Sequence, residues 1–239
     1  MKKFQKAVKI SLTALIAIYI LLILFPQLLF ANKIEYKSFE VYHHNTINEQ
    51  KLKSVLDVSE KLLEGSELKS NSETQKLFLT ESYNEFTFFA LLSKNAFAVN
   101  YPVVQNIFFT KSDLSKNLIT RNNKSNNRRT LSGVIAHETI HSLLENKIGI
   151  IDFKLLPTWK IEGYADYIAK ESSYKATNDI DTICKTAQNK ASRSYKYFEY
   201  RIITEYLLEQ RNIELNKFLK NEFELENLKQ EVIENYCSQ

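Results

Sequence analysis

The stretch GVIAHETIHSLLENK, residues 133–147, places two of the four histidines of the chain four positions apart, with a glutamate directly after the first. Side chains four positions apart project from the same face of an α-helix, so His137 and His141 would lie one turn from each other. The apolar residues around them favour a helix that runs through the centre of a domain. Zinc binds such a pair, and Glu138 in this H-E-x-x-H arrangement is placed to take a proton from a water on the metal. An amphipathic surface helix would fit the same sequence, so the two histidines alone do not establish a site. A zinc site would need further residues elsewhere in the chain.

A catalytic zinc ion needs a third protein ligand and an open fourth position. No histidine follows His141 in the chain. The other two, His43 and His44, are neighbours on an expected strand, where adjacent side chains point to opposite faces. We interpret these two as an exposed or half-buried pair on a strand, which leaves a carboxylate as the expected third ligand.

The segment LPTWKIEGYADYIAK, residues 156–170, offers two carboxylates on one face of an expected helix over 158–171, with Thr158 as its N-cap. Glu162, separated from His141 by 20 residues, would be the third ligand. Asp166, one turn further, is suited to accept the second N–H of a ligating histidine. Gly163 and Ala165 would allow a close approach to another helix. The alternative is that both carboxylates are surface charges.

This pattern, H-E-x-x-H followed about twenty residues later by P-T-W-x-x-E-G-x-A-D-Y, resembles the gluzincin zinc metallopeptidases. Within them it is most similar to the aminopeptidase-like and small peptidase MA-like domains. The resemblance covers roughly residues 95–210 and is strongest over 130–168. It implies a zincin-like fold in which His137, His141 and Glu162 bind zinc. Glu138 would be the general base, and Asp166 would be the carboxylate behind one of the ligands.

The same resemblance implies a cleft beside an edge strand and a group that stabilises the developing oxyanion. NAFAVNYP (95–102) resembles the edge strand, to which an extended peptide would add. Aminopeptidase-like members use a tyrosine ahead of a C-terminal helix, which implies Tyr197 first and Tyr195 second within 192–210. Either tyrosine would equally fit a core position. Weaker alternatives are Arg193 and Arg201.

The N-terminal segment combines a lysine-rich head with 21 residues, Ile10 to Phe30, that carry no formal charge. As one helix this run would span about 31 Å at ~1.5 Å per residue, close to a hydrocarbon thickness of roughly 30 Å. The lysines precede it, so the N-terminus would stay cytoplasmic and residues 32–239 would lie outside the cell membrane. A cleaved signal peptide and a secreted domain form the alternative. We divide the chain into this segment (1–31) and one domain (32–239).

Composition and charge narrow the class of protein. The lysines before Ile10 account for the net charge of +4, so the remainder is neutral overall, which argues against a nucleic-acid partner. The Asn- and Arg-rich segment 121–129 is interpreted as a solvated loop. Cys184 and Cys237, the only cysteines, would form one disulfide in an oxidising exterior or remain free.

The expected fold class is α+β, with a small mixed sheet followed by a helical half. Strands are expected first, then helices, with 85–94 ambiguous between the two. The expected strands lie within 37–46, 76–82, 95–102 and 103–113, and the expected helices over about 48–65, 130–147, 158–171, 192–211 and 213–235, the last with a possible break.

Taken together, these features predict a membrane-anchored, zinc-dependent peptidase that hydrolyses peptide or protein substrates with Glu138 as general base. No glycine-rich segment for binding a peptide amino terminus is visible, so exopeptidase activity is not implied. One alternative is an inactive gluzincin-like domain that binds an envelope protein or peptide. Another is an anchored domain whose histidines are structural.

Overall fold

A five-stranded mixed sheet forms the base of the domain in the computed structural model, which describes residues 2–69, 73–121, 128–176, 178–185 and 192–237. Its strand order is β1-β2-β3-β5-β4, so β4 is an edge strand. The β2–β3 and β3–β5 pairs are parallel, and the two outer pairs are antiparallel. The strands are β1 (Asn32–Tyr36), β2 (Phe39–His43), β3 (Gln75–Leu79), β4 (Ala98–Tyr101) and β5 (Asn106–Phe109).

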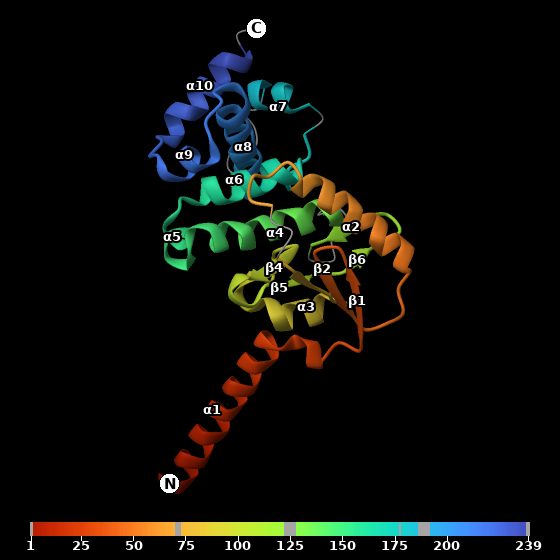
Figure 1. The fold of residues 1–239 in the computed structure, drawn as a ribbon. Helices are drawn as coiled ribbons and strands as arrows, with labels where there is room; N and C mark the ends of the chain where they lie inside the picture. Colours follow the sequence, from red (N-terminus) through yellow and green to blue (C-terminus); the bar gives the residue numbers. More distant parts are fainter. Residues whose placement is uncertain (1, 70–72, 122–127, 177, 186–191, 238–239) are drawn as a thin grey trace.

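Alternating side chains give this sheet two buried faces. Leu77 and Ile107 join the main core under helices α2 (Glu49–Leu63) and α4 (Leu131–Ile148). Phe78 and Phe108 point to the opposite face, where an aromatic cluster packs against α3 (Tyr83–Ala90). The sheet therefore lies between α3 and the α2/α4 layer (Figure 1).

The central helix α4 is buried almost all round, as its apolar sequence predicts. It begins where the Thr130 hydroxyl accepts a hydrogen bond from the Gly133 amide at 3.0 Å, an N-cap. It ends at Gly149, whose φ of +85° suits a glycine. The sheet lies on one side of α4 and the helical half on the other (Figure 1). Different side chains of α4 can therefore contact the sheet and the later helices.

The helical half follows α4 in the sequence. Helices α6 and α8 pack together, and Figure 1 shows the later helices stacked beyond them. Its elements are α5 (Ile150–Leu155), α6 (Thr158–Ala169), α7 (Asp179–Lys185), α8 (Arg193–Glu205), a π-helical turn η4 (Tyr206–Gln210), α9 (Leu215–Lys220) and α10 (Leu225–Cys237). The α+β class with a mixed sheet is thus confirmed, and the expected break in 213–235 falls between α9 and α10.

Several local expectations need correction. The ambiguous segment 85–94 is mainly helical, since Ser82 caps α3 by accepting from the Glu85 amide at 3.1 Å. Thr158 is the first residue of α6 rather than its cap. Pro157 occupies the cap position, and no side chain makes a capping hydrogen bond there. Strand β1 was not anticipated, since three of the five residues in NKIEY are polar and the strand lies largely exposed at the sheet edge.

A second, three-stranded antiparallel sheet precedes α4 and was not expected either. Its strands are β6 (Ser112–Asp113), β7 (Leu118–Thr120) and β8 (Arg128–Thr130). The expected loop 121–129 lies largely outside the described residues, which omit 122–127. Its end is no solvated loop, because Arg129 is buried on β8.

The N-terminal helix α1 (Lys2–Leu24) projects away from the domain (Figure 1). Among the described residues it is the one helix long and apolar enough to cross a membrane, and a signal sequence would have the same properties. It ends six residues before the charge-free run does at Phe30. Pro26, which lacks an N–H, starts a 3₁₀ turn, η1 (Pro26–Leu28), and ends the expected single helix at Leu24.

Cys184 and Cys237 form a disulfide with a Cα–Cα distance of 5.6 Å. It ties α7 to the last residue of α10, across 53 residues of sequence. Of the two alternatives left open by the sequence, the structure therefore contains the bonded form. Closing such a loop stabilises the fold mainly by restricting the unfolded chain.

The contact between α6 and α8 depends on Gly163, as the sequence suggested. A Cβ added there would lie 2.7 Å from the Tyr200 carbonyl oxygen and would also meet the Thr204 hydroxyl. The Tyr200 oxygen belongs to the backbone of α8, so it cannot swing away as a flexible side chain would. Glu162, the neighbour of Gly163, is thus held by a helix that has little freedom to shift.

We expect Gly163→Ala to lower the free energy of unfolding by about 1–3 kcal/mol, because the added methyl overpacks the α6–α8 contact. This would outweigh the gain of about 1 kcal/mol that alanine usually brings inside a helix. Denaturant unfolding followed by circular dichroism measures the change. Gly65→Ala is the matched control, since its added Cβ comes no closer than 3.3 Å to another atom. Equal stabilities for the two variants would contradict this packing account.

Candidate metal centre

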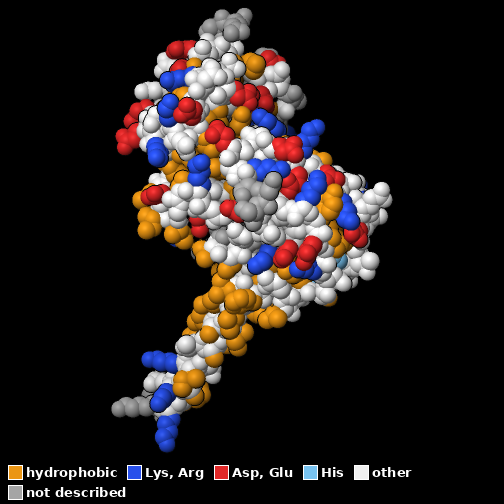
Figure 2. All heavy atoms as spheres, in the orientation of Figure 1, with side chains coloured by type: hydrophobic (Ala, Val, Ile, Leu, Met, Phe, Trp, Pro, Cys, Tyr) orange, Lys and Arg blue, Asp and Glu red, His pale blue; other side chains and the backbone are white. Residues whose placement is uncertain are grey.

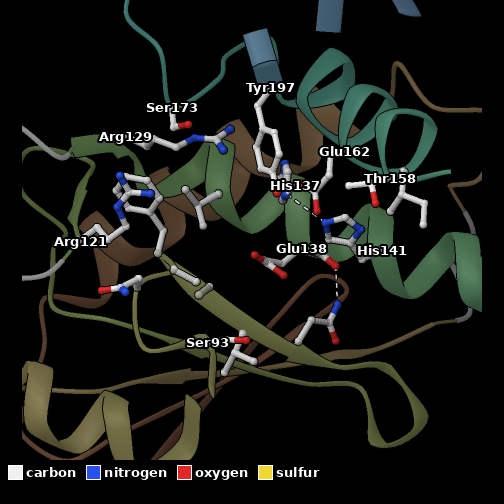
Figure 3. Close-up of a pocket in the computed structure, with 18 of the residues that line it drawn as sticks. Ser93, Arg121, Arg129, His137, Glu138, His141, Thr158, Glu162, Ser173 and Tyr197 are labelled. Atoms are coloured by element: carbon white, nitrogen blue, oxygen red, sulfur yellow. Dashed lines mark hydrogen bonds and ion pairs between the residues drawn. The ribbon is translucent and has the colours of Figure 1, made fainter. Parts of the chain in front are cut away.

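Three side chains from two helices converge on one point. His137 and His141 lie on α4 and Glu162 on α6, and one ligand atom from each lies within 4.8 Å of the others. The two Nε2 atoms are 3.0 Å apart, and His137 Nε2 lies 3.4 Å from Glu162 Oε2. Figure 3 shows the three side chains pointing toward one another. These residues could hold a metal ion, since two imidazole nitrogens and a carboxylate oxygen are common ligands.

Asp166 orients one of these histidines. Its Oδ1 lies 2.8 Å from His137 Nδ1 and 2.9 Å from Arg129 Nη2, and the carboxyl group is fully buried. With Nδ1–H donated to Asp166, the lone pair of Nε2 faces His141 and Glu162. A carboxylate in this position fixes the tautomer and raises the basicity of a ligating imidazole.

Arg129 in turn is held by a second carboxylate. Its Nε lies 3.1 Å from Glu171 Oε1, and its Nη2 donates to the Glu171 carbonyl oxygen at 3.2 Å. Buried charges need partners of this kind, because each would otherwise carry a large desolvation penalty. The chain of contacts from Glu171 through Arg129 to Asp166 thus joins β8 to α6 behind the three convergent side chains.

The charges around the convergent residues set their protonation in the metal-free protein. Burial alone would lower the pKa of His137, but the charge and hydrogen bond of Asp166, helped by Glu162, raise it to about 10. Burial and the charge of His137 lower the pKa of His141 to about 4. Although burial would raise the pKa of Glu162, hydrogen bonding and charge from the histidines lower it to about 2. A metal ion would therefore compete with a proton on His137.

Glu138 lies beside this group without belonging to it. Its side chain lines the adjoining cleft, and burial raises its pKa to about 7, against the opposing effect of His137. Its carbonyl oxygen accepts a hydrogen bond from Asn100 Nδ2 at 2.6 Å, and the same amide donates to Ser142 Oγ at 2.9 Å. A carboxyl group with a pKa near neutrality can both take up and release a proton at neutral pH.

The cleft has a volume of about 640 Å³ and runs between the edge strand β4 and the helices α4 and α6. Ala98, Val99 and Asn100 of β4 form part of its lining. The convergent histidines and Glu162 lie between its walls, with Arg121 and Ser93 also at the cavity (Figure 3). An extended chain in this cleft would pass close to the possible metal position.

The two tyrosines expected to stabilise an oxyanion lie in different environments. Tyr197 lines the cleft, and its hydroxyl accepts hydrogen bonds from Arg193 Nε at 3.2 Å and Nη2 at 2.8 Å. Tyr195 is fully buried and packs against Tyr174 and Phe198, with ring centroids 5.3 and 5.7 Å apart. Tyr195 is therefore a core residue, and this position does not fit the catalytic role expected for it.

The two arginines suggested as alternatives to the tyrosines also lie in different places relative to the cleft. Arg193 lines the cleft beside Tyr197. Arg201 is buried away from it and pairs with Asp179 of α7 at 2.6 Å. The reason is distance along the helix: position 201 lies eight residues, about 12 Å, beyond position 193, where α8 contacts α7. Among the described residues of α8, only those in its first two turns line the cleft.

His43 and His44 stay apart from the candidate metal ligands, as the sequence suggested, but they are not the exposed or half-buried strand pair that was expected, because His43 is buried and His44 follows the end of β2. His43 is buried at the end of β2, with Nδ1 2.8 Å from the Asn45 carbonyl oxygen. His44 lies 2.6 Å from Glu85 Oε1 and stacks on Phe30 with 4.4 Å between ring centroids. Both histidines therefore have local partners at the far end of the sheet.

Sequence reasoning missed Arg129 and Asn100. Arg129 stood in a polar segment interpreted as a solvated loop, and the pattern of that segment gave no sign of burial. One signal did exist: Asp166 sits among apolar residues and, if buried, needs a cation. Asn100 falls inside the expected edge strand, where its polar side chain breaks the apolar pattern of NAFAVNYP.

Comparisons with known proteins add no family assignment. No protein-family model matches the chain, and no curated protein matches it.

We expect Asp166→Asn to lower the affinity for a divalent metal roughly 10- to 100-fold, because His137 would lose the carboxylate that orients it. Isothermal titration with zinc measures the affinity. The variant would also lose about 3–5 kcal/mol of stability, since Arg129 keeps its buried charge with one partner fewer. Asp152→Asn, an exposed carboxylate on the neighbouring α5, is the matched control. Unchanged zinc affinity in a folded Asp166→Asn protein would show that the carboxylate does not orient a ligand.

Proposed function

We propose that this chain is a zinc-dependent peptidase whose metal is held by His137, His141 and Glu162. The observation that carries the proposal is the convergence of these three ligand atoms, with Asp166 directing the Nε2 of His137 toward the other two. Two imidazoles and one carboxylate form a ligand set typical of catalytic zinc, which keeps a fourth position for water or substrate. The residues present therefore fit the metal.

Zinc at this position would supply Lewis acidity toward a substrate carbonyl and would lower the pKa of water. Glu138 has the position and the pKa of a general base: it would take a proton from the attacking water and later pass it to the leaving amine. Tyr197, held by Arg193 at the cleft, is placed to donate a hydrogen bond to the developing oxyanion. Asn100 holds the backbone of Glu138 against β4 and so acts as a positioning residue.

A peptide substrate is favoured by the edge strand. Strand β4 pairs on one side with β5 and lines the cleft with Ala98, Val99 and Asn100. An extended peptide could add to this edge through main-chain hydrogen bonds, which would lay its amide groups across Glu138 and the metal ligands. The gluzincin resemblance of the H-E-x-x-H and E-G-x-A-D segments supports the same reaction class, since those enzymes hydrolyse peptide bonds.

The test joins metal content with turnover. Purified full-length protein should hold about one zinc per chain by inductively coupled plasma mass spectrometry, as expected for one set of three protein ligands. It should also cleave members of a broad peptide library. Glu138→Gln should retain the zinc but lose at least about 100-fold in kcat, since general bases contribute typically 10²–10⁴-fold. Glu64→Gln, an exposed carboxylate at the end of α2, is the control.

The outcomes separate the alternatives. Zinc binding without turnover in the wild-type chain would favour a domain that binds peptides and does not cut them. Metal content that is equally low in wild type and in His137→Ala would leave the histidines with a structural role and overturn the proposal. Full activity in Glu138→Gln would reject Glu138 as the base.

A further inference from the structure

The base of α1 is built into the domain. The fully buried side chain of Asn106 donates to the carbonyl oxygens of Ile23 and Leu24, at 3.1 and 3.3 Å, where the last turn of α1 leaves its acceptors open. Ile23 and Pro26 are buried as well. Asn106 is the first residue of β5, so α1 ends directly on a central strand of the sheet and its direction is coupled to the domain.

The residues after α1 are also part of the core. Phe30 is buried in the aromatic cluster under the sheet, 5.1 Å from the Phe78 ring and stacked on His44. Cleavage after Ala31 would remove Phe30 and expose that cluster. It would also leave the buried Asn106 amide without its acceptors on α1, which is costly. These contacts favour a retained anchor over a removed signal peptide.

The whole of α1 is long enough to cross a bilayer, but its charge-free part is shorter than the hydrocarbon core. Its charge-free part, Ile10 to Leu24, is about 22 Å long at ~1.5 Å per residue, against a hydrocarbon core of roughly 30 Å. The apolar length must therefore be completed beyond Leu24, or by bilayer thinning and lysine snorkelling at the other end. What lies beyond Leu24 is the underside of the domain.

That underside carries exposed apolar side chains. We call them the anchor patch, and it consists of Phe25, Leu28, Leu29, Phe88, Leu91 and Val103. Tyr19 connects the patch to α1: its hydroxyl donates to the Phe88 carbonyl oxygen, and the two rings meet edge to face at 5.2 Å. Tyr19 precedes Leu24 by five residues, so Phe88 lies about 8 Å back along the helix axis. Figure 2 shows the hydrophobic surface of α1 continuing onto the adjoining domain.

From these contacts we infer that α1 stays attached in the mature protein and that the anchor patch sits in the interfacial layer of the bilayer. The occupant of the patch is thus lipid. Tyr19 would lie just inside this layer, close to the interface where tyrosine is enriched, and the patch would supply the apolar depth that the charge-free part of α1 lacks. The rigid junction at Asn106 would hold the domain in one orientation above the membrane.

This seating has a consequence that rests on the proposed function. The turn that carries Val103, η3 (Pro102–Val104), follows β4 directly, and β4 lines the cleft. A peptide paired with β4 would then lie close to the membrane surface. The substrate class favoured by this geometry is the membrane-proximal segment of a protein anchored in the same membrane.

Tryptophan quenching by lipid tests the seating without reference to activity. The chain has one tryptophan, Trp159, buried in α6. In full-length protein reconstituted into phosphatidylcholine vesicles with brominated acyl chains, Val103→Trp should add emission that is quenched. Val103 is 76% exposed, so the substitution leaves packing intact. Leu28→Trp, at a position 83% exposed, gives a second reading of the same patch.

Two controls bracket the result. Ile16→Trp, exposed on α1, reports a tryptophan within the bilayer, and Ile180→Trp on α7 reports one at the far end of the domain. We expect Val103→Trp and Leu28→Trp to be quenched, although less strongly than Ile16→Trp, which lies deeper in the bilayer. If both match Ile180→Trp while Ile16→Trp is quenched, the domain stands clear of the membrane and the inference fails. If Ile16→Trp is itself not quenched, α1 is not inserted and the inference also fails, whereas the zinc and turnover measurements are unaffected.

Discussion

The buried carboxylate of Asp166 is the interaction on which the site depends. It accepts from His137 on one side and from Arg129 on the other, with no exposure to solvent. A carboxylate so placed would be unstable without both partners. The Asp166 carboxylate therefore fixes the tautomer of His137, with Nε2 free for a metal. It also fixes the position of Arg129 at the junction between β8 and α4.

The rest of the architecture brings the remaining groups to this carboxylate. Helix α4 is buried on all sides and presents His137 and His141 to α6, while its other face touches β4. Gly163 lets α6 approach the backbone of α8, which sets the depth at which Glu162 and Asp166 enter the site. The first two turns of α8 then place Tyr197 and Arg193 at the cleft. Helices α4, α6 and α8 thus each contribute side chains to the site, and each also limits the movement of the helix packed against it.

Much of this arrangement could be predicted from the sequence, because the relevant rules are local. The spacing of His137 and His141 and that of Glu162 and Asp166 place each pair on one helical face, and the scarcity of histidine points to a carboxylate as third ligand. The α+β order follows from the shift of periodicity along the chain. What escaped prediction depends on long-range packing: the burial of Arg129 and the pairing of the short strands β6–β8. Helical spacing alone also could not distinguish Tyr195 in the core from Tyr197 in the cleft.

The coordination shell of the metal tests the central claim most directly. X-ray absorption spectroscopy of the zinc-loaded full-length protein should give a shell of two imidazole nitrogens and oxygen ligands at about 2.0–2.2 Å. The imidazole signal should fall by half in His141→Ala, and one oxygen should be lost in Glu162→Ala. A shell without imidazole scattering, or one that is unchanged in both variants, would contradict the assignment of His137, His141 and Glu162 as the metal ligands.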